Sequence, residues 1–535
     1  MSFSTIDLII FSGWIIFMMG FGIWISRSKQ ETTQDYFLAS KALPWWAVGG
    51  SLIASNISAE QFIGMSGSGY VVGFAIATYE LMAALTLLIV AKFFLPVFLK
   101  RGIYTMPQFL EDRFDGRVRT GLAIFWVLLF VFVNITSVLY LGGLALQTIM
   151  GIPLIYGVIG LALFASTFSI FGGLKAVVWT DVVQVVVLIF GGLLASVMVL
   201  NALGGSFLGG LQTLLTEAPE KFDMILDKAN PEYMNLPGIS VLIGGMWIAN
   251  IYYWGNNQYI IQRTLAAKSL KEAQNGAAFA AFLKILLPLI VVIPGIAAFV
   301  LQADIGKPDE AYPWVLNNYV GVGFKGLAFA ALIAAIGSSL SSMVNSASTI
   351  FTLDIYRPFF LSTNSKKSLD AHEHDSASLS MEEESKLVKI GRVAAGVSLL
   401  LGVIVAPLLG NLDQAFQYIQ EYTGFISPGV VAVFLLGLFW KKTSANAALV
   451  AVILAIPLSV GFKLLTPQIP FLDRMGLSFL ILCGIMIAIS LIENKSSNDA
   501  KGIVFPDGLF KTGSVFNISA LIVCGMLAVI YALFW

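Results

Sequence analysis

Long runs of apolar residues, separated by shorter polar connections, recur from one end of the chain to the other. An α-helix rises about 1.5 Å per residue, so a helix that crosses about 30 Å of hydrocarbon needs roughly 17 to 25 predominantly apolar residues. Breaks at glycine, proline and charged positions divide the chain into about fourteen such runs. The pattern predicts an all-α protein that crosses a membrane many times. The runs lie near 6–26, 46–66, 70–98, 121–149, 152–171, 176–200, 238–262, 273–302, 323–355, 388–408, 411–438, 444–464, 473–492 and 513–535.

The composition is that of a membrane protein and excludes several other classes. Of the residues, 58% are hydrophobic and 12% are charged, whereas about a quarter of a soluble domain is charged. The formal net charge is zero, and no basic arm or acidic tail indicates nucleic acid as a partner. The expected partners are the lipid bilayer and small solutes, and no obligate protein partner is implied.

The first apolar run and the two cysteines have ordinary interpretations. The run 6–26 is too long for a typical signal-peptide core and has no small-residue cleavage site, so we expect it to remain as a spanning helix. Cys483 and Cys524 both lie within apolar runs, where their spacing fits neither a metal cluster nor a disulfide framework. We interpret both as packing residues.

The distribution of Lys and Arg predicts the orientation. With an even number of crossings both termini lie on one side, and placing them outside puts most Lys and Arg residues in the inner connections. The positive-inside rule therefore predicts external, periplasmic termini. The outer connections then contain only Lys221, Lys228, Lys307, Lys325, Lys463 and Arg474.

Two long connections differ in character. Segment 201–237 combines glycine, proline and acidic residues with some apolar ones, which predicts a small ordered external cap. Segment 361–387 is polar and low in aromatic residues, which predicts a mobile internal loop. His372 and His374 lie in it, and so short a tract is better explained by a solvated loop than by a metal site, so they receive no role.

A few polar side chains interrupt the apolar runs. Each costs several kcal/mol in hydrocarbon unless it is paired, so each is a functional-site hypothesis. The alternative is that these groups only join helices, and for a lone asparagine the two interpretations have equal weight. Two acids and a lysine favour a binding site for the set as a whole. The set contains Asn56, Glu60, Gln61, Glu80, Asn134, Asp181, Asn250, Lys284, Ser338, Ser339, Gln420 and Glu421.

The densest polar patch is the string ASNISAEQF at 54–62. Asn56 and Glu60 are four residues apart and share one helical face, with Gln61 one step round. Glycines follow this patch in IGMSGSG, and EYTGFISPG places glycine and proline directly after Gln420 and Glu421. Helices interrupted near the membrane midplane expose backbone carbonyls, with which transporters coordinate ions and substrates. A packing kink is the alternative, but the polar neighbours of both breaks argue against it.

Hydroxyl and aromatic groups complete the inventory. Ser338 and Ser339 are either small packing residues or, beside carbonyls freed by a break at 54–57, part of an all-oxygen shell for a monovalent cation. Tyr252, Tyr253 and Trp254 lie close to Asn250, as suits a sugar that stacks on a ring and hydrogen-bonds through its hydroxyls. An interfacial aromatic belt is the alternative for Tyr252 or Trp254 alone.

Five strings in order, ISAEQFIGMSGSGY, VWTDVVQ, YYWGNNQYIIQRTLAAKS, AAIGSSLSSM and QYIQEYTGFISPG, resemble the sodium/solute symporter family, relatives of the sodium/glucose cotransporters. The resemblance implies one transmembrane domain with a LeuT-type fold, in which ten core helices form two inverted repeats of five. It also implies that sodium entry drives the uptake of a sugar, galactose or glucose, by alternating access across a bacterial inner membrane, without enzymatic chemistry. The parts are an extra helix at 6–26, repeats at 46–200 and 238–438, and three peripheral helices within 444–535.

The resemblance also implies roles for particular residues. The implied sugar site consists of Gln61, Glu80, Asn250, Lys284 and Gln420 with Asn56, Asn134, Tyr253, Tyr79 and Glu60 nearby, and Glu60 either lines the site or braces it. The implied gates are Tyr253, Met65 and Phe416, with Arg263 at the inner gate. The implied sodium ligands are the carbonyls of Ala54, Ile57 and Ala335 and the hydroxyls of Ser338 and Ser339, with Asp181 on the sodium path.

Two departures from the family pattern concern the choice of solute. Ala83 stands where a sugar-contacting serine is expected, and Asn256 stands where an aromatic residue is expected. The same machinery carrying glucose, a sialic acid, an amino acid or another polyol is therefore an alternative. Lys284 with Glu80 would suit an amino acid's charges, whereas the amides and Tyr253 suit a neutral polyol. A solute sensor or a channel is a weaker alternative, since broken-helix sites are typical of alternating-access carriers.

Overall fold

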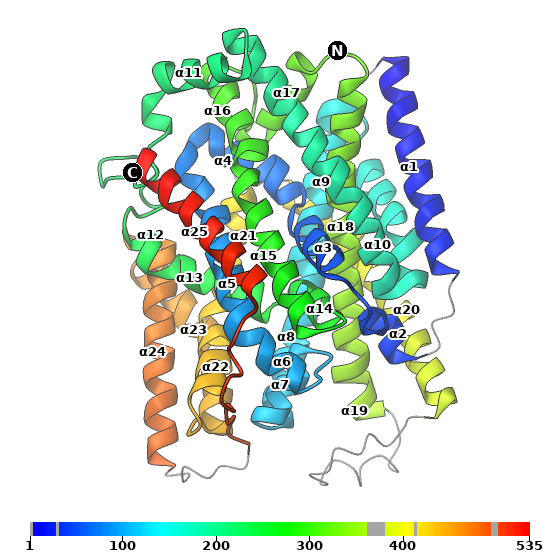
Figure 1. The fold of residues 1–535 in the computed structure, drawn as a ribbon, viewed down its shortest axis with the longest axis vertical. Helices are drawn as coiled ribbons and strands as arrows, with labels where there is room; N and C mark the ends of the chain where they lie inside the picture. The colour runs from blue at the N-terminus through cyan, green and yellow to red at the C-terminus, as the bar shows by residue number, and fades with distance from the viewer. Residues whose placement is uncertain (1–3, 28–31, 361–379, 411–414, 494–500) are drawn as a thin grey trace.

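The computed structural model describes residues 4–27, 32–360, 380–410, 415–493 and 501–535, and its regular elements are helices (Figure 1). Ten of the described helices are long and apolar enough to cross a membrane, and Leu154–Thr167 and Ser427–Phe439 are shorter apolar helices. The runs near 46–66 and 238–262 are interrupted helices. The predicted number of about fourteen crossings and the division into two repeats stay predictions.

The elements of the first part of the chain lead to the long helix α10. In order they are α1 (Thr5–Ser26), α2 (Thr33–Leu38), η1 (Ala39–Lys41), α3 (Trp45–Asn56), η2 (Glu60–Met65), α4 (Ser66–Val71), η3 (Phe74–Ala77), α5 (Thr78–Ile89), η4 (Val90–Phe94), α6 (Leu95–Lys100), α7 (Met106–Arg113), α8 (Gly116–Leu129), η5 (Phe130–Ile135), α9 (Thr136–Met150) and α10 (Leu154–Gly204). Within α10 the chain bends at Gly173, whose φ of +54° is one that glycine adopts readily. This bend separates the two predicted runs 152–171 and 176–200.

The second part of the chain contains the elements from α11 to α25. In order they are α11 (Phe207–Glu217), η6 (Pro219–Lys221), α12 (Ser240–Ile243), α13 (Gly245–Ile251), η7 (Tyr252–Asn256), α14 (Gln258–Leu265), α15 (Leu270–Leu287), η8 (Pro288–Val292), α16 (Ile293–Val300), η9 (Pro308–Glu310), α17 (Ala311–Tyr319), α18 (Phe324–Ile350), η10 (Phe351–Tyr356), α19 (Arg357–Phe360), α20 (Met381–Val405), η12 (Ala406–Leu409), α21 (Ala415–Thr423), α22 (Ser427–Phe439), α23 (Ala445–Leu465), α24 (Phe471–Ile492) and α25 (Ser514–Leu533).

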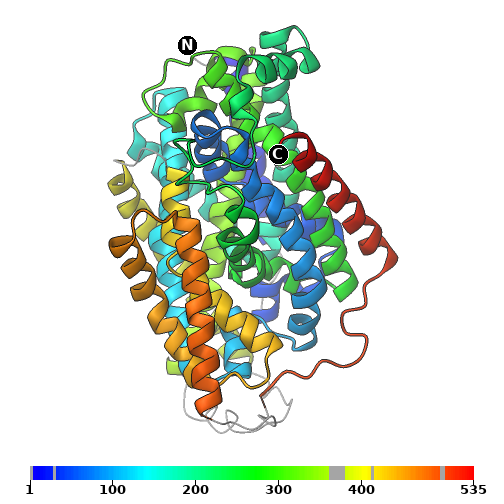
Figure 2. The ribbon, with the colours of Figure 1, turned by 90° about the vertical axis from the view of Figure 1, so that its left-hand side faces the viewer.

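Burial separates a core from peripheral helices. The segment Phe324–Phe360, which contains α18, is 94% buried over its most apolar window, and α18 runs through the middle of the molecule (Figure 1). The corresponding values are 17% for α1, 22% for α23, 28% for α24 and 17% for α25. Figure 2 shows α25 along one side of the molecule and α24 at its face. These four helices therefore present apolar side chains outward, as helices facing lipid do.

The helix that starts the polar patch breaks where the sequence predicts it. Helix α3 ends at Asn56, and Ile57 is extended with φ −73° and ψ 107°. Helical structure resumes at Glu60 with the π-helix η2. The glycines after the patch do not form the break, which corrects that part of the interpretation. They allow close packing instead, because a Cβ at Gly64 would lie 2.8 Å from the Cβ of Phe416.

Two further breaks border the same region. Asn257 is extended, with φ −82° and ψ 123°, between η7 and α14, and the sequence did not predict this break. The chain also leaves the helix between α21 and α22, next to Gly424, as predicted. Pro428 lies in the first turn of α22, where a missing backbone N–H costs nothing.

The two long connections have different outcomes. In 201–237 the side chains of Phe222, Met224 and Leu226 are buried, so the predicted external cap is ordered. The predicted loop 361–387 is too long, because Ser380 and Glu383 form a capping box and α20 begins at Met381. His372 and His374 lie outside the described residues.

Candidate functional site

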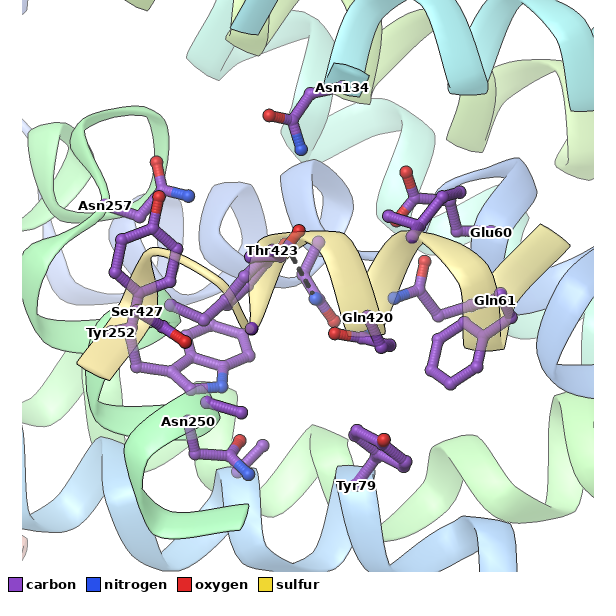
Figure 3. A pocket seen from close by; sticks show the side chains of 18 of the residues that line it. Glu60, Gln61, Tyr79, Asn134, Asn250, Tyr252, Asn257, Gln420, Thr423 and Ser427 are labelled. Atoms are coloured by element: carbon purple, nitrogen blue, oxygen red, sulfur yellow. Dashed lines mark hydrogen bonds between the residues drawn. The ribbon is translucent and has the colours of Figure 1, made fainter. Parts of the chain in front are cut away.

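One cavity in the core collects the polar residues that the sequence predicts for the solute. It holds about 740 Å³ of space between atoms, open solvent included. Figure 3 shows amide and aromatic side chains pointing into this space from several helices. All ten predicted residues line it: Asn56, Glu60, Gln61, Tyr79, Glu80, Asn134, Asn250, Tyr253, Lys284 and Gln420.

The broken helices bring these residues together. Asn56 is the last residue of α3 and Gln61 lies in η2, on opposite sides of the first break. Asn250 and Tyr253 precede the break at Asn257, and Gln420 precedes the break after α21. Each break therefore places a polar side chain at the cavity, while α5, η5 and α15 supply further parts of the wall.

The charged groups at the cavity are paired with each other. The Lys284 ammonium donates to the Glu80 carboxylate and to the Asn56 side-chain oxygen, and Lys284 and Glu80 are almost fully buried. The Asn56 amide nitrogen donates to the Tyr253 hydroxyl at 2.9 Å, and the Tyr259 hydroxyl also donates to Tyr253. A continuous polar chain thus joins α5, α15, α3 and η7, and its two charges neutralise each other.

The amides retain hydrogen-bonding capacity for a solute. The Gln61 side-chain oxygen accepts from the backbone nitrogen of Ser58 at 2.9 Å and from its hydroxyl at 3.0 Å, which fixes the direction of the amide. The Asn134 side-chain oxygen is buried and has no partner in the described residues. The Asn250 amide nitrogen donates to the Met246 carbonyl at 3.1 Å, which leaves its oxygen for the cavity.

Glu60 has its own bracing contacts. Its carboxylate accepts from the Ser137 hydroxyl at 3.1 Å, and its backbone nitrogen donates to the Ser58 hydroxyl at 3.0 Å. Since Glu60 also lines the cavity, it both braces η2 against α9 and borders the site. The sequence left these two roles open, and the geometry is compatible with both.

Aromatic rings form another part of the cavity wall. Of the predicted gate residues, some line the cavity and others do not. Tyr252, Tyr253 and Trp254 all line the cavity, and the Lys284 ammonium lies 5.0 Å from the Trp254 ring centre. Phe416 also lines it and makes an edge contact with Tyr79 at 5.2 Å between ring centres. Two predicted gate residues, Met65 and Arg263, are fully buried but do not line the cavity.

Sequence reasoning missed several lining residues. Asn257, Thr423 and Ser427 line the cavity, and a signal existed because each lies within or next to a string already considered. Met475 also lines it, although α24 carries no polar patch that would have drawn attention. Ala83, one of the two departures from the family pattern, lies in this wall. The other departure does not: Asn256 is fully buried away from the cavity, and neither of its amide atoms has a partner in the described residues.

The predicted sodium ligands lie where α18 meets the end of α3. The Ser339 hydroxyl is 2.9 Å from the Ser55 carbonyl and 3.3 Å from the Ile57 carbonyl. Ala54 and Ala335 are fully buried on the same two helices. The pairing of these helices agrees with the prediction, and the oxygen atoms gathered there are the type that binds hard cations.

A buried carboxylate borders this oxygen cluster. The Asp181 carboxylate accepts from the hydroxyls of Ser338 at 2.6 Å, Ser51 at 2.5 Å and Ser55 at 3.2 Å. The Arg263 guanidinium lies 3.7 Å from the same carboxylate, with both side chains fully buried. Because Ser338 donates its hydrogen to Asp181, its lone pairs remain for a cation. Asp181 and Arg263 thus border the cluster.

Comparison with known proteins decides the family. The model of the sodium:solute symporter family matches residues 36–455. The chain belongs to the sodium:solute symporter family. It is also 52% identical to the sodium/glucose cotransporter of Vibrio parahaemolyticus, over 99% of this chain and 98% of that one. Sodium/myo-inositol cotransporter 2 of the mouse is 32% identical, over 86% of this chain and 70% of that one. The symporter is therefore a multi-pass membrane protein with sodium as its co-transported ion.

A solved structure confirms the fold class. The symporter resembles a Na⁺-coupled sialic acid symporter, solved in a substrate-bound outward-open state, with a TM-score of 0.78 and 25% identity. The similarity covers 92% of this chain and 98% of that one. A nucleobase-cation-symport-1 family transporter aligns with a TM-score of 0.54 at 15% identity, which supports the fold alone. The symporter thus has the predicted LeuT-type helical fold.

Proposed function

We propose that the symporter carries a neutral sugar, galactose or glucose, into the cell together with sodium. The observation that carries this proposal is the cavity in which six amide side chains and five aromatic side chains surround a mutually neutralised Lys284–Glu80 pair. A neutral polyol presents hydroxyls to the amides and a C–H face to a ring. An amino acid or an anion would need a free charge, and Lys284 and Glu80 already satisfy each other. The name of the Vibrio relative, a sodium/glucose cotransporter, supports the same solute class.

The residue roles follow from the position of each group. We assign Gln61, Asn250 and Gln420 to hydrogen bonds with the sugar, and Tyr253 to stacking on its ring and to the inner gate. Lys284 and Glu80 donate and accept at the same cavity, which Asn56, Asn134, Tyr79 and Glu60 also line. We assign Phe416 and Met65 to the outer gate, where α21 packs onto η2.

Sodium binds in the proposal through the oxygen cluster between α3 and α18. The ligands are the carbonyls of Ala54, Ile57 and Ala335 and the hydroxyls of Ser338 and Ser339, while Asp181 assists the ion on its way inward and Arg263 belongs to the inner gate.

Coupling and localisation complete the proposal. The break after Asn56 separates the sugar-facing side chains of Asn56 and Gln61 from the sodium-facing carbonyls by only a few residues. A sodium ion that fixes this break therefore favours the geometry that binds sugar, and by linkage sugar tightens sodium binding equally. The cycle is alternating access across a bacterial inner membrane, with both termini outside.

The experiment is counterflow in proteoliposomes. Labelled galactose enters vesicles preloaded with unlabelled galactose, glucose, myo-inositol, a sialic acid or proline, in the presence of sodium. We expect galactose and glucose to drive the exchange and the charged solutes to fail. Gln61→Ala is the control that retains the fold and loses a sugar contact. If unlabelled galactose inside the vesicles drives no entry of labelled galactose, the galactose assignment is wrong, and the same exchange with labelled sialic acid or labelled proline then identifies the solute.

A further inference from the structure

A peripheral helix, α24, reaches the solute cavity. Met475, in the first turns of the peripheral helix α24, lines the cavity together with Gly424 and Ser427 of the α21–α22 break. The Ser427 hydroxyl lies 3.6 Å from the Met475 sulfur. The wall at this point is therefore one flexible thioether side chain, flanked by a single hydroxyl.

Backbone contacts fix the position of Met475. A Cβ at Gly245, the first residue of α13, would lie 1.9 Å from the Leu472 carbonyl oxygen of α24. A Cβ at Gly424 would lie 2.7 Å from the Met475 terminal methyl. The start of α24 is thus packed, without room for another carbon, against the helix of Asn250 and the break that follows Gln420.

Ion pairs also hold the start of α24 against α21. Glu421, next to Gln420, accepts from the Arg474 guanidinium at 2.9 Å and from the Lys463 ammonium at 3.1 Å, one cation to each carboxylate oxygen. The Arg474 side chain is only 12% exposed, so solvent screens this pair less than a surface pair. Arg474 directly precedes Met475 in α24. The ion pair between Glu421 and Arg474 therefore links the position of α21 to the position of the Met475 side chain in the cavity wall.

A second cavity lies behind that wall. It is smaller, with about 230 Å³ of space between atoms, open solvent included, and shares Gly424 and Met475 with the solute cavity. Its remaining lining includes Glu421, Arg474 and the hydroxyls of Ser459 and Ser478, which are buried and have no partner in the described residues. Met475 is therefore the partition between two spaces, both of which offer polar groups.

We propose that Met475 contacts the bound sugar and sets the largest sugar that the symporter accepts, with Glu421 as the positioning residue. The inference rests on the proposed function, since it assumes a sugar in the cavity. Removing the Met475 side chain joins the second cavity to the first. An extra substituent on a hexose then occupies the volume that the Met475 side chain vacates, next to the hydroxyls of Ser459 and Ser478.

The test compares uptake of galactose and methyl α-galactoside by proteoliposomes under a sodium gradient. Met475→Ala should raise the kcat/KM ratio of the methylated to the plain sugar by about tenfold, as expected for space gained in a pocket. Met475→Leu conserves side-chain volume and should keep the wild-type ratio. Met486→Ala is the matched control, because Met486 is fully buried on the same helix and does not line the cavity. An unchanged ratio in a folded Met475→Ala variant would overturn the proposal.

A second measurement isolates Glu421. Glu421→Gln should raise the galactose KM roughly fivefold with little change in maximal rate, since a partly buried ion pair is lost and the binding groups remain. Glu421→Asp should recover part of the affinity, and Glu421→Gln should have little further effect in an Arg474→Gln background. Equal effects of Glu421→Gln in both backgrounds would overturn its positioning role. If wild-type protein shows no sodium-dependent uptake of any sugar, the proposed function fails; if it transports sugar and the variants behave as wild type, only this inference fails.

Discussion

At the scale of single residues, the site is built from polar groups that are satisfied by one another before a solute arrives. Lys284 is bonded to Glu80 and Asn56, and Gln61 is oriented by Ser58. Such groups are preorganised, so a solute does not have to order them on binding. A buried pair of this kind is costly to break from one side.

Replacing Lys284 tests the buried pair. Lys284→Met leaves the Glu80 carboxylate buried without its cation, which should lower the free energy of unfolding by about 3–5 kcal/mol and abolish sugar uptake. The double variant Lys284→Met with Glu80→Leu should recover most of the stability and none of the uptake. Lys92→Met, at an exposed lysine of η4, is the control. Thermal unfolding in detergent measures the effect, and equal melting temperatures of wild type and Lys284→Met would contradict the pairing.

Removing a single hydroxyl tests the sodium cluster. Ser339→Ala removes an oxygen beside the Ser55 and Ile57 carbonyls, and we expect the sodium concentration for half-maximal uptake to rise about tenfold, or ~1.4 kcal/mol. Ser346 lies on the same helix, but its hydroxyl donates to Gln262. Ser346→Ala should therefore leave the sodium concentration for half-maximal uptake unchanged. Sodium titrations of uptake distinguish the two variants. Identical curves for wild type and Ser339→Ala would place the ion elsewhere.

The polar site residues were predictable because placing an unpaired polar side chain in hydrocarbon costs several kcal/mol of free energy. Asn56, Glu80 and Lys284 stand out in apolar runs for this reason, and the structure brings them into contact. Thr423 and Met475 did not stand out, because neither is rare in membrane helices and only the fold shows that they face the cavity.

At the scale of elements, the helix breaks determine where the site lies. The breaks at 54–57 and after Gln420 were predictable from polar residues next to glycine and proline, whereas the extended Asn257 was not. Asparagine tolerates several backbone conformations without forcing any of them. The glycines after Glu60 were assigned to the break, and their true role is close packing, which depends on neighbours remote in sequence.

A methyl group at Gly64 tests that packing role. The new Cβ would lie 2.8 Å from the Phe416 Cβ, so Gly64→Ala should keep α21 from closing over η2. In the proposed cycle we expect sugar binding to the solubilised protein to persist while the uptake rate falls about tenfold or more. Gly484→Ala, where nothing lies within 4 Å of the added carbon, should transport like wild type. Normal uptake by Gly64→Ala would rule out Gly64 as the closing contact.

At the scale of the whole molecule, the apolar pattern predicted the helical class, whereas the outer helices were implied only by the resemblance to the family. The start of α1 and the end of α25 both lie in the upper half of the molecule (Figure 1). The exact number of crossings and the repeat symmetry do not follow from hydropathy, because interrupted helices contribute short segments. Epitope tags at the two termini test the predicted topology. Both tags should bind antibody on intact spheroplasts, and a tag that becomes accessible only after permeabilisation would reverse it.

The central claim is that a sodium gradient drives sugar through this site, and the most direct measurement is galactose accumulation in proteoliposomes. With sodium outside and potassium inside, we expect the galactose concentration inside the vesicles to rise above the outside concentration. When potassium replaces the external sodium, we expect the two concentrations only to become equal. Gln61→Ala should accumulate little galactose under the same gradient. Accumulation that is the same with potassium as with sodium, or no sodium-dependent uptake of any sugar, would contradict the account.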